Sequence, residues 1–459
     1  MRVIVFLRSQ KKIFTGHDSM AILGMAIGRL FGAAREILVI LLLGVTQLAD
    51  LAILLWMLPE ILVFLCTTNG INSSLISRLQ SGHTLQARTT IISALFLCSI
   101  LVACLAIASS LNLPLLISLV APGLEFDFQD QSFGTLAMIV LLSSPLVVVA
   151  SVLSAVLNSN KKYVYQGLGT AAANVGFIIG LVVGWVTDHV LVFVTLGILF
   201  GLSVRVMWLG SQINRHSINL GSWCGFTSMQ YSLLFGIVGA SLSYLIFIAA
   251  PVAVRSLAST LGEGYLVMTA LSIKLIQVPL MVVLNSFALV SLQKLAAAYR
   301  HDPLEVNEIL KRRLLLTLGF SSAMTLIIFY GSDYLESFLP LFLPLTSHKL
   351  FFVIEFLAHA SFGLPLMGLA YLLNSDFHAR AEPKFLLLAS CSAVFLVFFS
   401  LNLYDQMETS KLYLIWISFV LIYASLIIII RAWQLGFKSN AQLITGFFYA
   451  SLVGFIGSL

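Results

Sequence analysis

Two arginines inside an apolar stretch are the first residues of this sequence that could do chemistry. The stretch "GRLFGAAREILVILLLGVTQLAD" occupies positions 28–50, contains Arg29 and Arg35, and ends on Asp50. A charge at mid-bilayer costs at least about 2.5–3.5 kcal/mol, so a mid-depth arginine indicates a polar cavity. Its fork of donors suits a phosphate. For Arg35, snorkelling to the outer interface or pairing with Glu36 or Asp50 is the alternative.

Other ionisable residues also lie within apolar stretches. Lys274, in "MTALSIKLIQVPLMVV", is predicted to be a second anion-binding group, with a structural pair to Glu60 as the alternative. Glu355 and His359 are four residues apart and share a helix face, where they could relay protons, hold a cation or form a structural polar pair. Arg205 lies toward the cytoplasmic end of its stretch, where snorkelling is the favoured interpretation.

The composition determines the class of protein that positions these residues. The chain has 459 residues, of which 59% are hydrophobic and 10% are charged, whereas a soluble protein has about 25% charged residues. The sequence therefore predicts an all-α polytopic membrane protein. The net charge of +6 indicates basic cytoplasmic loops rather than nucleic-acid binding. The sequence has no P-loop, dinucleotide fingerprint, HExxH or CxxC motif, so we expect no enzyme activity, cofactor or metal.

Thirteen stretches are long and apolar enough to span a bilayer. They are approximately 19–43, 50–76, 89–111, 133–157, 164–186, 190–212, 226–253, 265–293, 312–331, 350–374, 384–403, 411–432 and 440–458. With a cytoplasmic N-terminus, eighteen Lys and Arg residues fall on the inside and three on the outside, the three being Arg255, Lys349 and Lys411. This asymmetry supports the predicted orientation.

Small residues and prolines indicate where helices approach one another or break. Gly24, Gly28 and Gly32 form a ridge on the first stretch, which favours close helix packing, with a helix that bends during transport as the alternative. Pro59 and Pro279 lie within the second and eighth stretches, where a helix break is tolerated beside a cavity. These two stretches also share an apolar run, a central proline and a basic end, which suggests a duplicated six-helix unit.

Several segments together resemble the MurJ/MviN family of lipid-linked precursor flippases, within the multidrug/oligosaccharidyl-lipid/polysaccharide exporter superfamily. The opening "GRLFGAAREILVILLLGVTQLADLAILLWMLPE" has that family's Arg, Leu-x-Gly, second Arg, Asp and Leu-Pro order. The segments "LVAPGL", "LSAVLNSNKKYVYQGLGTAAANVGFIIGLV", "SIKLIQVPLMVV" and "GLPLMGLAYLLNSDFHARAEPK" resemble later parts of the family. The family usually has Arg at the position of Lys274, and arginines where this chain has the uncharged "ILVFLCTTNG".

The resemblance implies about thirteen transmembrane helices, with two six-helix lobes around a central cavity and an extra C-terminal helix. We expect the lobes at residues 1–215 and 216–435 and the extra span at 436–459. The resemblance also implies that Arg29, Arg35 and Asp50 bind substrate in the cavity opposite Lys274. Glu60, Glu355 and His359 are candidates for coupling or gating, with H⁺ or Na⁺ as the coupling ion.

The expected function is translocation of an undecaprenyl-diphosphate-linked saccharide, similar to lipid II, across the bacterial cytoplasmic membrane for peptidoglycan synthesis. Membrane lipids are the other expected partners. Three alternatives stay open: a flippase for lipid-linked exopolysaccharide or O-antigen units, a cation-coupled drug antiporter, and a membrane polymerase or ligase. The basic excess of the intramembrane residues argues against the antiporter. The longest outer loop has no His or Arg, which argues against the enzyme.

Overall fold

The computed structural model describes most of the chain. The described residues are 16–66, 70–71, 74–76, 79, 84–124, 131–213, 228–301, 303–342, 346–380, 382–401, 412–435, 444–445 and 447–451. They contain helices and turns but no strand, which confirms the prediction of an all-α fold.

The first half of the chain contributes the helices α2 Gly16–Leu43, α3 Gln47–Cys66, α5 Thr84–Leu111, α6 Leu113–Val120, α7 Gln131–Leu142, α8 Ser144–Ser159, α9 Tyr163–Thr187 and α10 Val190–Ser211. The second half contributes α11 Ser228–Leu242, α12 Ile246–Ser259, α13 Tyr265–Pro279, the π-helix η3 Leu280–Leu284, α14 Asn285–His301, α15 Pro303–Phe342, α16 Ser347–Ala360, the 3₁₀-helix η4 Ser361–Gly363, α17 Leu364–Ala379, α18 Pro383–Leu401 and α19 Leu412–Leu435.

Within the described residues, eight helices are long and apolar enough to cross a membrane, or up to nine if the bent pair α11–α12 is one span. The predicted number of thirteen is therefore not confirmed. Helices α2 and α3 are not among the eight. Most of the predicted thirteenth span, 440–458, lies outside the described residues.

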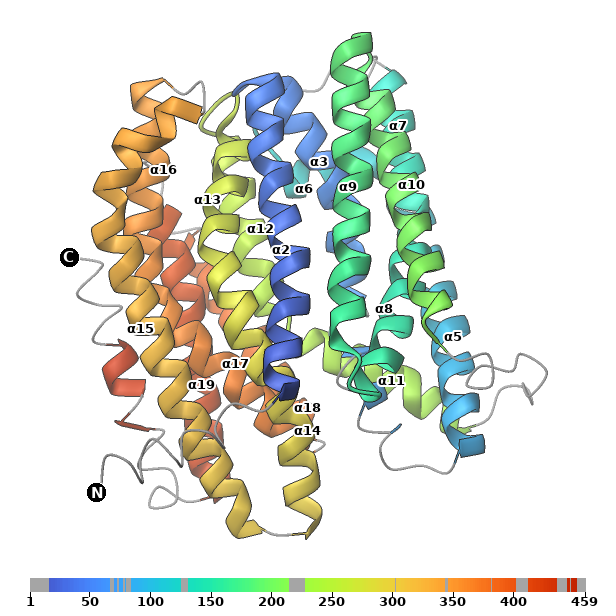
Figure 1. Cartoon of the computed structure of the whole chain (residues 1–459), viewed down its shortest axis with the longest axis vertical. Coiled ribbons are helices and arrows are strands. Elements are labelled where there is room, and N and C mark those ends of the chain that lie inside the picture. The colour runs from blue at the N-terminus through green and yellow to red at the C-terminus, as the bar shows by residue number, and fades with distance from the viewer. Residues whose placement is uncertain are drawn as a thin grey trace.

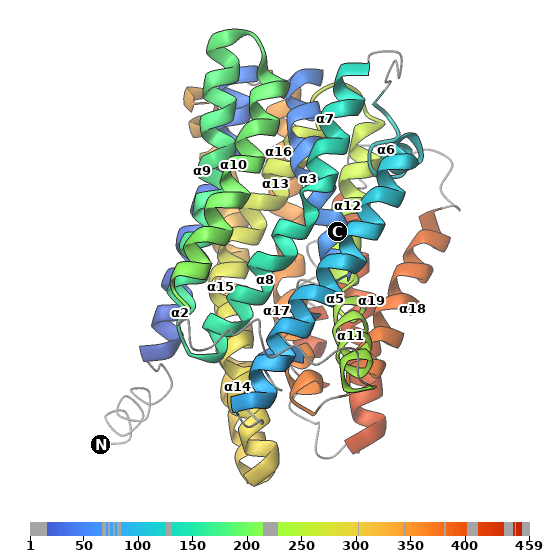
Figure 2. The same ribbon diagram turned by 90° about the vertical axis from the view of Figure 1, so that its right-hand side faces the viewer.

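The helices stand roughly parallel, and α2 lies between the two halves of the chain (Figure 1). On one side α2 packs against α9, and on the other it packs against α13, η3 and α14. Helix α3 likewise contacts α8 and α10 of the first half and α11 to α13 of the second. Figure 2 shows α5 to α8 and α11 along the face where the two halves meet again. Helices α2 and α3 therefore form the central seam of the described structure.

The seam between α2 and α9 depends on glycine. A Cβ on Gly24 would lie 2.7 Å from the carbonyl oxygen of Tyr163, and a Cβ on Gly167 would collide with the backbone of Gly24. A Cβ on Gly28 would lie 3.0 Å from the Cβ of Thr170. The ridge predicted from the sequence therefore serves close helix packing, as in small-xxx-small contacts.

Two predicted spans are broken beside the molecular centre. Helices α11 and α12 are bent by 49° at a turn around Ser243, whose carbonyl oxygen accepts hydrogen bonds from Tyr423 (3.1 Å) and Ser390 (2.7 Å). The eighth span changes from α-helix to π-helix directly after Pro279, because a proline removes a helical hydrogen bond. In both places irregular backbone lies within the protein rather than in lipid.

The end of the molecule that carries the turns at 44–46 and 260–264 is called the outer end here, following the predicted orientation, and lies at the top of Figure 1. Several hydrogen bonds join the two halves there. The Lys349 ammonium donates across the halves to the Val45 carbonyl oxygen and, within the second half, to the Glu263 carbonyl oxygen, both at 3.1 Å. The Ser256 hydroxyl donates to the Leu119 carbonyl oxygen (3.0 Å), and the Gly123 N–H donates to the Ser259 hydroxyl (3.1 Å). The outer end is therefore closed.

Candidate functional site

A cavity of about 270 Å³ lies between the two halves of the chain. Its walls come from α2, α3, α8, α9 and α10 of the first half and from the α11–α12 break, α12, α13, α14 and α17 of the second. Pro59 lines the cavity, and the broken eighth span supplies Lys274 and Gln277 before the break and Ala288 after it. The prediction that the two prolines mark helices beside a cavity therefore holds for both spans.

The cavity is strongly basic. Four cations line it: Arg29 from α2, Arg205 from α10, Arg255 from α12 and Lys274 from α13. Its one acidic lining residue among those described is Glu60 from α3, and no ion pair joins Glu60 to any of the four in the described structure. Cations that share a cavity repel one another, and one carboxylate neutralises only part of that charge. The arrangement therefore favours an anionic ligand.

The charged residues occupy different depths, as their positions along their helices indicate. Arg29, Glu60 and Arg205 lie 13–15 residues from the outer ends of α2, α3 and α10, or roughly 20–23 Å at 1.5 Å per residue. Lys274 lies nine residues from the outer end of α13, roughly 14 Å. Arg255 lies four residues from the outer end of α12, roughly 6 Å. The cations thus form a series from mid-depth toward the outer end.

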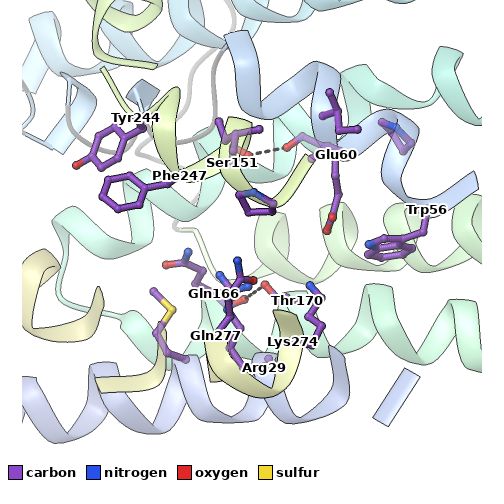
Figure 3. A pocket seen from close by; sticks show the side chains of 18 of the residues that line it. Arg29, Trp56, Glu60, Ser151, Gln166, Thr170, Tyr244, Phe247, Lys274 and Gln277 are labelled. Atoms are coloured by element: carbon purple, nitrogen blue, oxygen red, sulfur yellow. Dashed lines mark hydrogen bonds between the residues drawn. The ribbon is translucent and has the colours of Figure 1, made fainter. Parts of the chain in front are cut away.

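Figure 3 shows how these side chains face one another. Arg29, Gln166 and Lys274 lie on one side of the cavity, and the Glu60 carboxylate points into the space between them and α3. Two of the predicted substrate-binding residues, Arg29 and Lys274, therefore come together from different halves of the chain. Glu60, predicted as a coupling residue, lies in the same space.

Uncharged polar groups and aromatic rings complete the lining. Ser151, Asn158, Gln166 and Thr170 belong to α8 and α9, and the Asn158 amide donates to the Gln166 side-chain oxygen (2.7 Å). Tyr244, Phe247 and Tyr371 are on the opposite half, where the Phe247 and Tyr371 rings stack with centroids 4.2 Å apart. Amides, hydroxyls and aromatic faces can contact a sugar without requiring charge.

Arg35 lies behind the cavity wall rather than on it. Only 1% of its surface is exposed, and its guanidinium donates to the Glu36 carboxylate (2.5 Å) and to the Asn174 side-chain oxygen (3.2 Å). The same group lies 4.1 Å from the centroid of the Trp56 ring, which does line the cavity. The structure thus shows the Glu36 pairing that the sequence left as an alternative, and Arg35 supports Trp56 from behind.

Asp50 lies at the outer end, away from the residues that line the cavity. Its buried carboxylate accepts hydrogen bonds from the backbone N–H groups of Gly264 (2.6 Å) and Val267 (2.8 Å). These groups are at the N-terminus of α13, where a carboxylate is favourable. Gly264 has φ +82°, and a Cβ there would lie 2.8 Å from the Val45 carbonyl oxygen, so glycine permits the approach. Asp50 therefore joins the halves as a helix cap.

Glu355 and His359 are both half-buried on α16, and neither lines the cavity. His359 Nδ1 lies 2.9 Å from the Glu355 backbone carbonyl oxygen, and its ring stacks on Tyr413 with centroids 4.6 Å apart. The two residues share a helix face, as their spacing predicts, and the pair belongs to the packing between α16 and α19.

For two of the four cavity cations the sequence predicts another location. The sequence predicts Arg255 in an outer segment after a span ending at 253, but α12 continues to Ser259 and Arg255 is 8% exposed inside the protein. It favours snorkelling of Arg205 to the interface, but Arg205 lines the cavity. The spacing of residues in the sequence could have placed Arg255 in the cavity. Phe247, Pro251 and Arg255 are four residues apart, so they share one helix face, and all three line the cavity.

A second charged cluster lies at the opposite, inner end of the second half. The Asp376 carboxylate accepts hydrogen bonds from Arg431 Nε (2.8 Å) and from the Tyr299 hydroxyl (2.5 Å), and it lies 3.5 Å from Arg380. These residues join α14, α17 and α19. Because its buried charge is paired and hydrogen-bonded, this cluster is a packing element.

Comparisons with known proteins agree with this arrangement. The family model "Lipid II flippase MurJ" matches residues 39–456. No curated protein sequence matches the chain. A solved lipid II flippase MurJ in an inward closed conformation is 18% identical, with a TM-score of 0.67, and the match covers 94% of this chain and 95% of that one.

Two other solved transporters share the fold. A mutant of the Vibrio cholerae MATE transporter VcmN is 15% identical with a TM-score of 0.72, over 94% of this chain and 99% of that one. A MOP superfamily transporter from Pyrococcus furiosus, described as having a binding pocket of reverse polarity, is 16% identical with a TM-score of 0.68, over 94% and 95% of the two chains.

The family model covers most of the chain, including α3, the cavity helices from α8 to α17 and the Asp376 cluster, and it begins near the end of α2, after Arg29. Its members are flippases for a lipid-linked precursor, which confirms the expectation of a transporter rather than an enzyme. The chain belongs to the lipid II flippase MurJ family and is a multi-pass protein of the inner membrane.

Proposed function

We propose that this protein moves an undecaprenyl-diphosphate-linked saccharide, similar to lipid II, from the inner to the outer leaflet for peptidoglycan synthesis. The observation that carries the proposal is the cavity between the two halves, where Arg29, Arg205, Arg255 and Lys274 face one carboxylate, Glu60. A lipid diphosphate needs matching cations when it leaves water, because an unpaired charge is costly in a medium of low dielectric constant.

In this proposal the diphosphate binds between the two halves. Arg29 can bind it with a planar fork of donors, and Lys274 adds a point charge from the opposite half. The polyprenyl tail stays in lipid, and the saccharide lies against the amides and hydroxyls of α8 and α9 and the rings of Phe247 and Tyr371. The MurJ family supports the lipid-linked class of cargo, and the lining supports a head group rich in hydroxyls.

The charge of the cavity argues against a cation-coupled drug antiporter as the alternative. A cationic drug would need acids at the binding site, and the described lining offers Glu60 alone against four cations. A flippase for lipid-linked exopolysaccharide or O-antigen units remains the second candidate. It is favoured by the uncharged segment "ILVFLCTTNG" at 61–70, where the resemblance leads us to expect arginines.

The proposed cycle uses the two halves as lobes, residues 1–215 and 216–435, with a cytoplasmic N-terminus and an additional span within 436–459. In the described state, hydrogen bonds of Asp50 and Lys349 join the halves at the end that this proposal assigns to the outside of the membrane. Coupling to H⁺ or Na⁺ is proposed to involve Glu60, which faces the cavity cations. Glu355 and His359 are proposed as gating residues on α16.

Complementation tests the proposed cargo. Cells depleted of their own peptidoglycan flippase should regain growth when this protein is expressed, and the Arg29→Ala variant should not restore it. The matched control is Arg312→Gln, because Arg312 is exposed on α15 and pairs with Glu308 on the same helix (3.4 Å). If the protein fails here but restores surface polysaccharide in cells that lack a polysaccharide flippase, the peptidoglycan assignment is wrong and the second candidate is correct.

A further inference from the structure

Arg255 has an environment that the binding of cargo at mid-depth does not explain. It is 8% exposed, it lines the cavity, and its Nε has no hydrogen-bond partner within the described part of the chain. An unpartnered buried donor carries a desolvation cost. It lies roughly 15 Å closer to the outer end than Arg29, as judged by their positions along α12 and α2.

The elements around Arg255 place it directly beneath the closed outer end. Ser256 and Ser259, on the same helix, form the hydrogen bonds that join α12 to the end of α6 and to the turn after it. Helix α12 also packs against α3 and α13, and α13 supplies Lys274 to the same cavity. Arg255 and Lys274 are thus the two cations on the outer side of the cavity, and both come from the second half of the chain.

The charges around Arg255 leave room for an added anion. The carboxylates of Glu36 and Glu60 attract the positive charge of Arg255, and the positive charge of Arg35 repels it. Glu36 is already paired with Arg35, and Glu60 is shared among all four cavity cations. The acids therefore compensate Arg255 only in part.

We propose that Arg255 and Lys274 form an outer anion subsite that holds the diphosphate of the cargo beneath the closed outer end, with Lys274 shared between this subsite and the mid-depth Arg29. The inference rests on the proposed function and adds a residue from α12 to the binding machinery. It also explains how the cavity remains basic although residues 61–70 carry no charge: a cation on α12 supplies charge from the opposite half.

The test measures binding of undecaprenyl diphosphate and of inorganic pyrophosphate to the full-length protein in lipid nanodiscs. The variants are Arg255→Gln, Arg255→Lys, Arg29→Gln and, as the matched control, Arg312→Gln. We expect Arg255→Gln to weaken binding of undecaprenyl diphosphate at least about 10-fold, because a hydrogen-bonded charge is lost. Arg255→Lys should recover part of the affinity, and Arg312→Gln should match the wild type.

The outcomes separate the subsite from the proposed function. If Arg29→Gln weakens binding and Arg255→Gln binds like Arg312→Gln, the outer subsite is wrong while the function stands. If neither substitution changes the affinity for undecaprenyl diphosphate, the proposed role of the cavity itself is wrong. If Arg255→Gln weakens binding of pyrophosphate alone, Arg255 binds a free anion and the assignment to cargo is overturned. Arg255→Lys keeps the cavity charge, so recovery with it excludes misfolding as the cause.

Discussion

Replacing Asp50 should open the outer end of the protein. Its carboxylate accepts hydrogen bonds from Gly264 N–H at 2.6 Å and from Val267 N–H at 2.8 Å, and it is completely buried. Both partners belong to the second half of the chain, so these bonds are lost when the halves separate at that end. In Asp50→Ala the two N–H groups remain without this acceptor in the closed state, whereas water can reach them in the open state.

The free energy that Asp50 contributes to closure can be estimated from its two hydrogen bonds. Each links a backbone donor to a carboxylate at a helix N-terminus, and together they should contribute about 2–3 kcal/mol net to closure. That corresponds to about a 30–150-fold change in the ratio of closed to open protein. A ratio of about 99 to 1 would fall to between roughly 3 to 1 and roughly 1 to 2. Asp50→Asn keeps one oxygen acceptor and loses the charge, so its effect should be smaller.

Distance measurements between spin labels can detect this change. Leu48 and Glu263 are exposed positions on opposite sides of the outer contact, and labels there require replacement of the five native cysteines. We expect a longer distance to gain population in Asp50→Ala and, independently, in Lys349→Met, which removes the donors to Val45 and Glu263. If Asp50→Ala leaves the distance distribution as in the wild type, Asp50 does not hold the outer end closed.

Three further substitutions test the cavity and the central seam. Arg29→Ala should abolish complementation while the folded protein is retained, and Arg29→Lys should keep part of the activity; normal growth with the alanine variant would contradict a role in binding cargo. Lys274→Arg should be tolerated and Lys274→Glu should be inactive, both measured by complementation, and full activity of Lys274→Gln would make the residue structural. Gly167→Val should destabilise the protein by more than about 1 kcal/mol, because the side chain would collide with Gly24; an unchanged thermal midpoint would contradict the close packing of α2 and α9.

Helical structure and the class of protein could be predicted because they depend on apolar composition and length. The location of Arg29 in a cavity also follows from its sequence position, because a mid-depth arginine cannot easily reach the interface. Arg255 could not be placed in the same way. It lies beyond residue 253, where the seventh apolar stretch is predicted to end, but α12 continues to Ser259.

The roles of Arg35 and Asp50 depend on distant parts of the chain. Arg35 contacts Asn174, which is 139 residues away, and Asp50 binds the start of α13, more than 200 residues away. Only the folded arrangement shows that one residue lies behind Trp56 and the other caps a helix. Residue type and depth identify which charges are unusual in such a sequence, whereas their partners come from tertiary packing.

Flipping of cargo in reconstituted vesicles is the direct measurement of the proposed transport. Undecaprenyl-diphosphate-linked saccharide is placed in both leaflets, and the fraction that reaches the outer leaflet is measured over time with an enzyme that modifies only exposed saccharide. We expect faster exposure with the wild type and with Arg312→Gln than in protein-free vesicles, and no acceleration with Arg29→Ala or Lys274→Glu. Equal acceleration by the wild type and by both cavity variants would contradict a cationic cavity that carries the diphosphate.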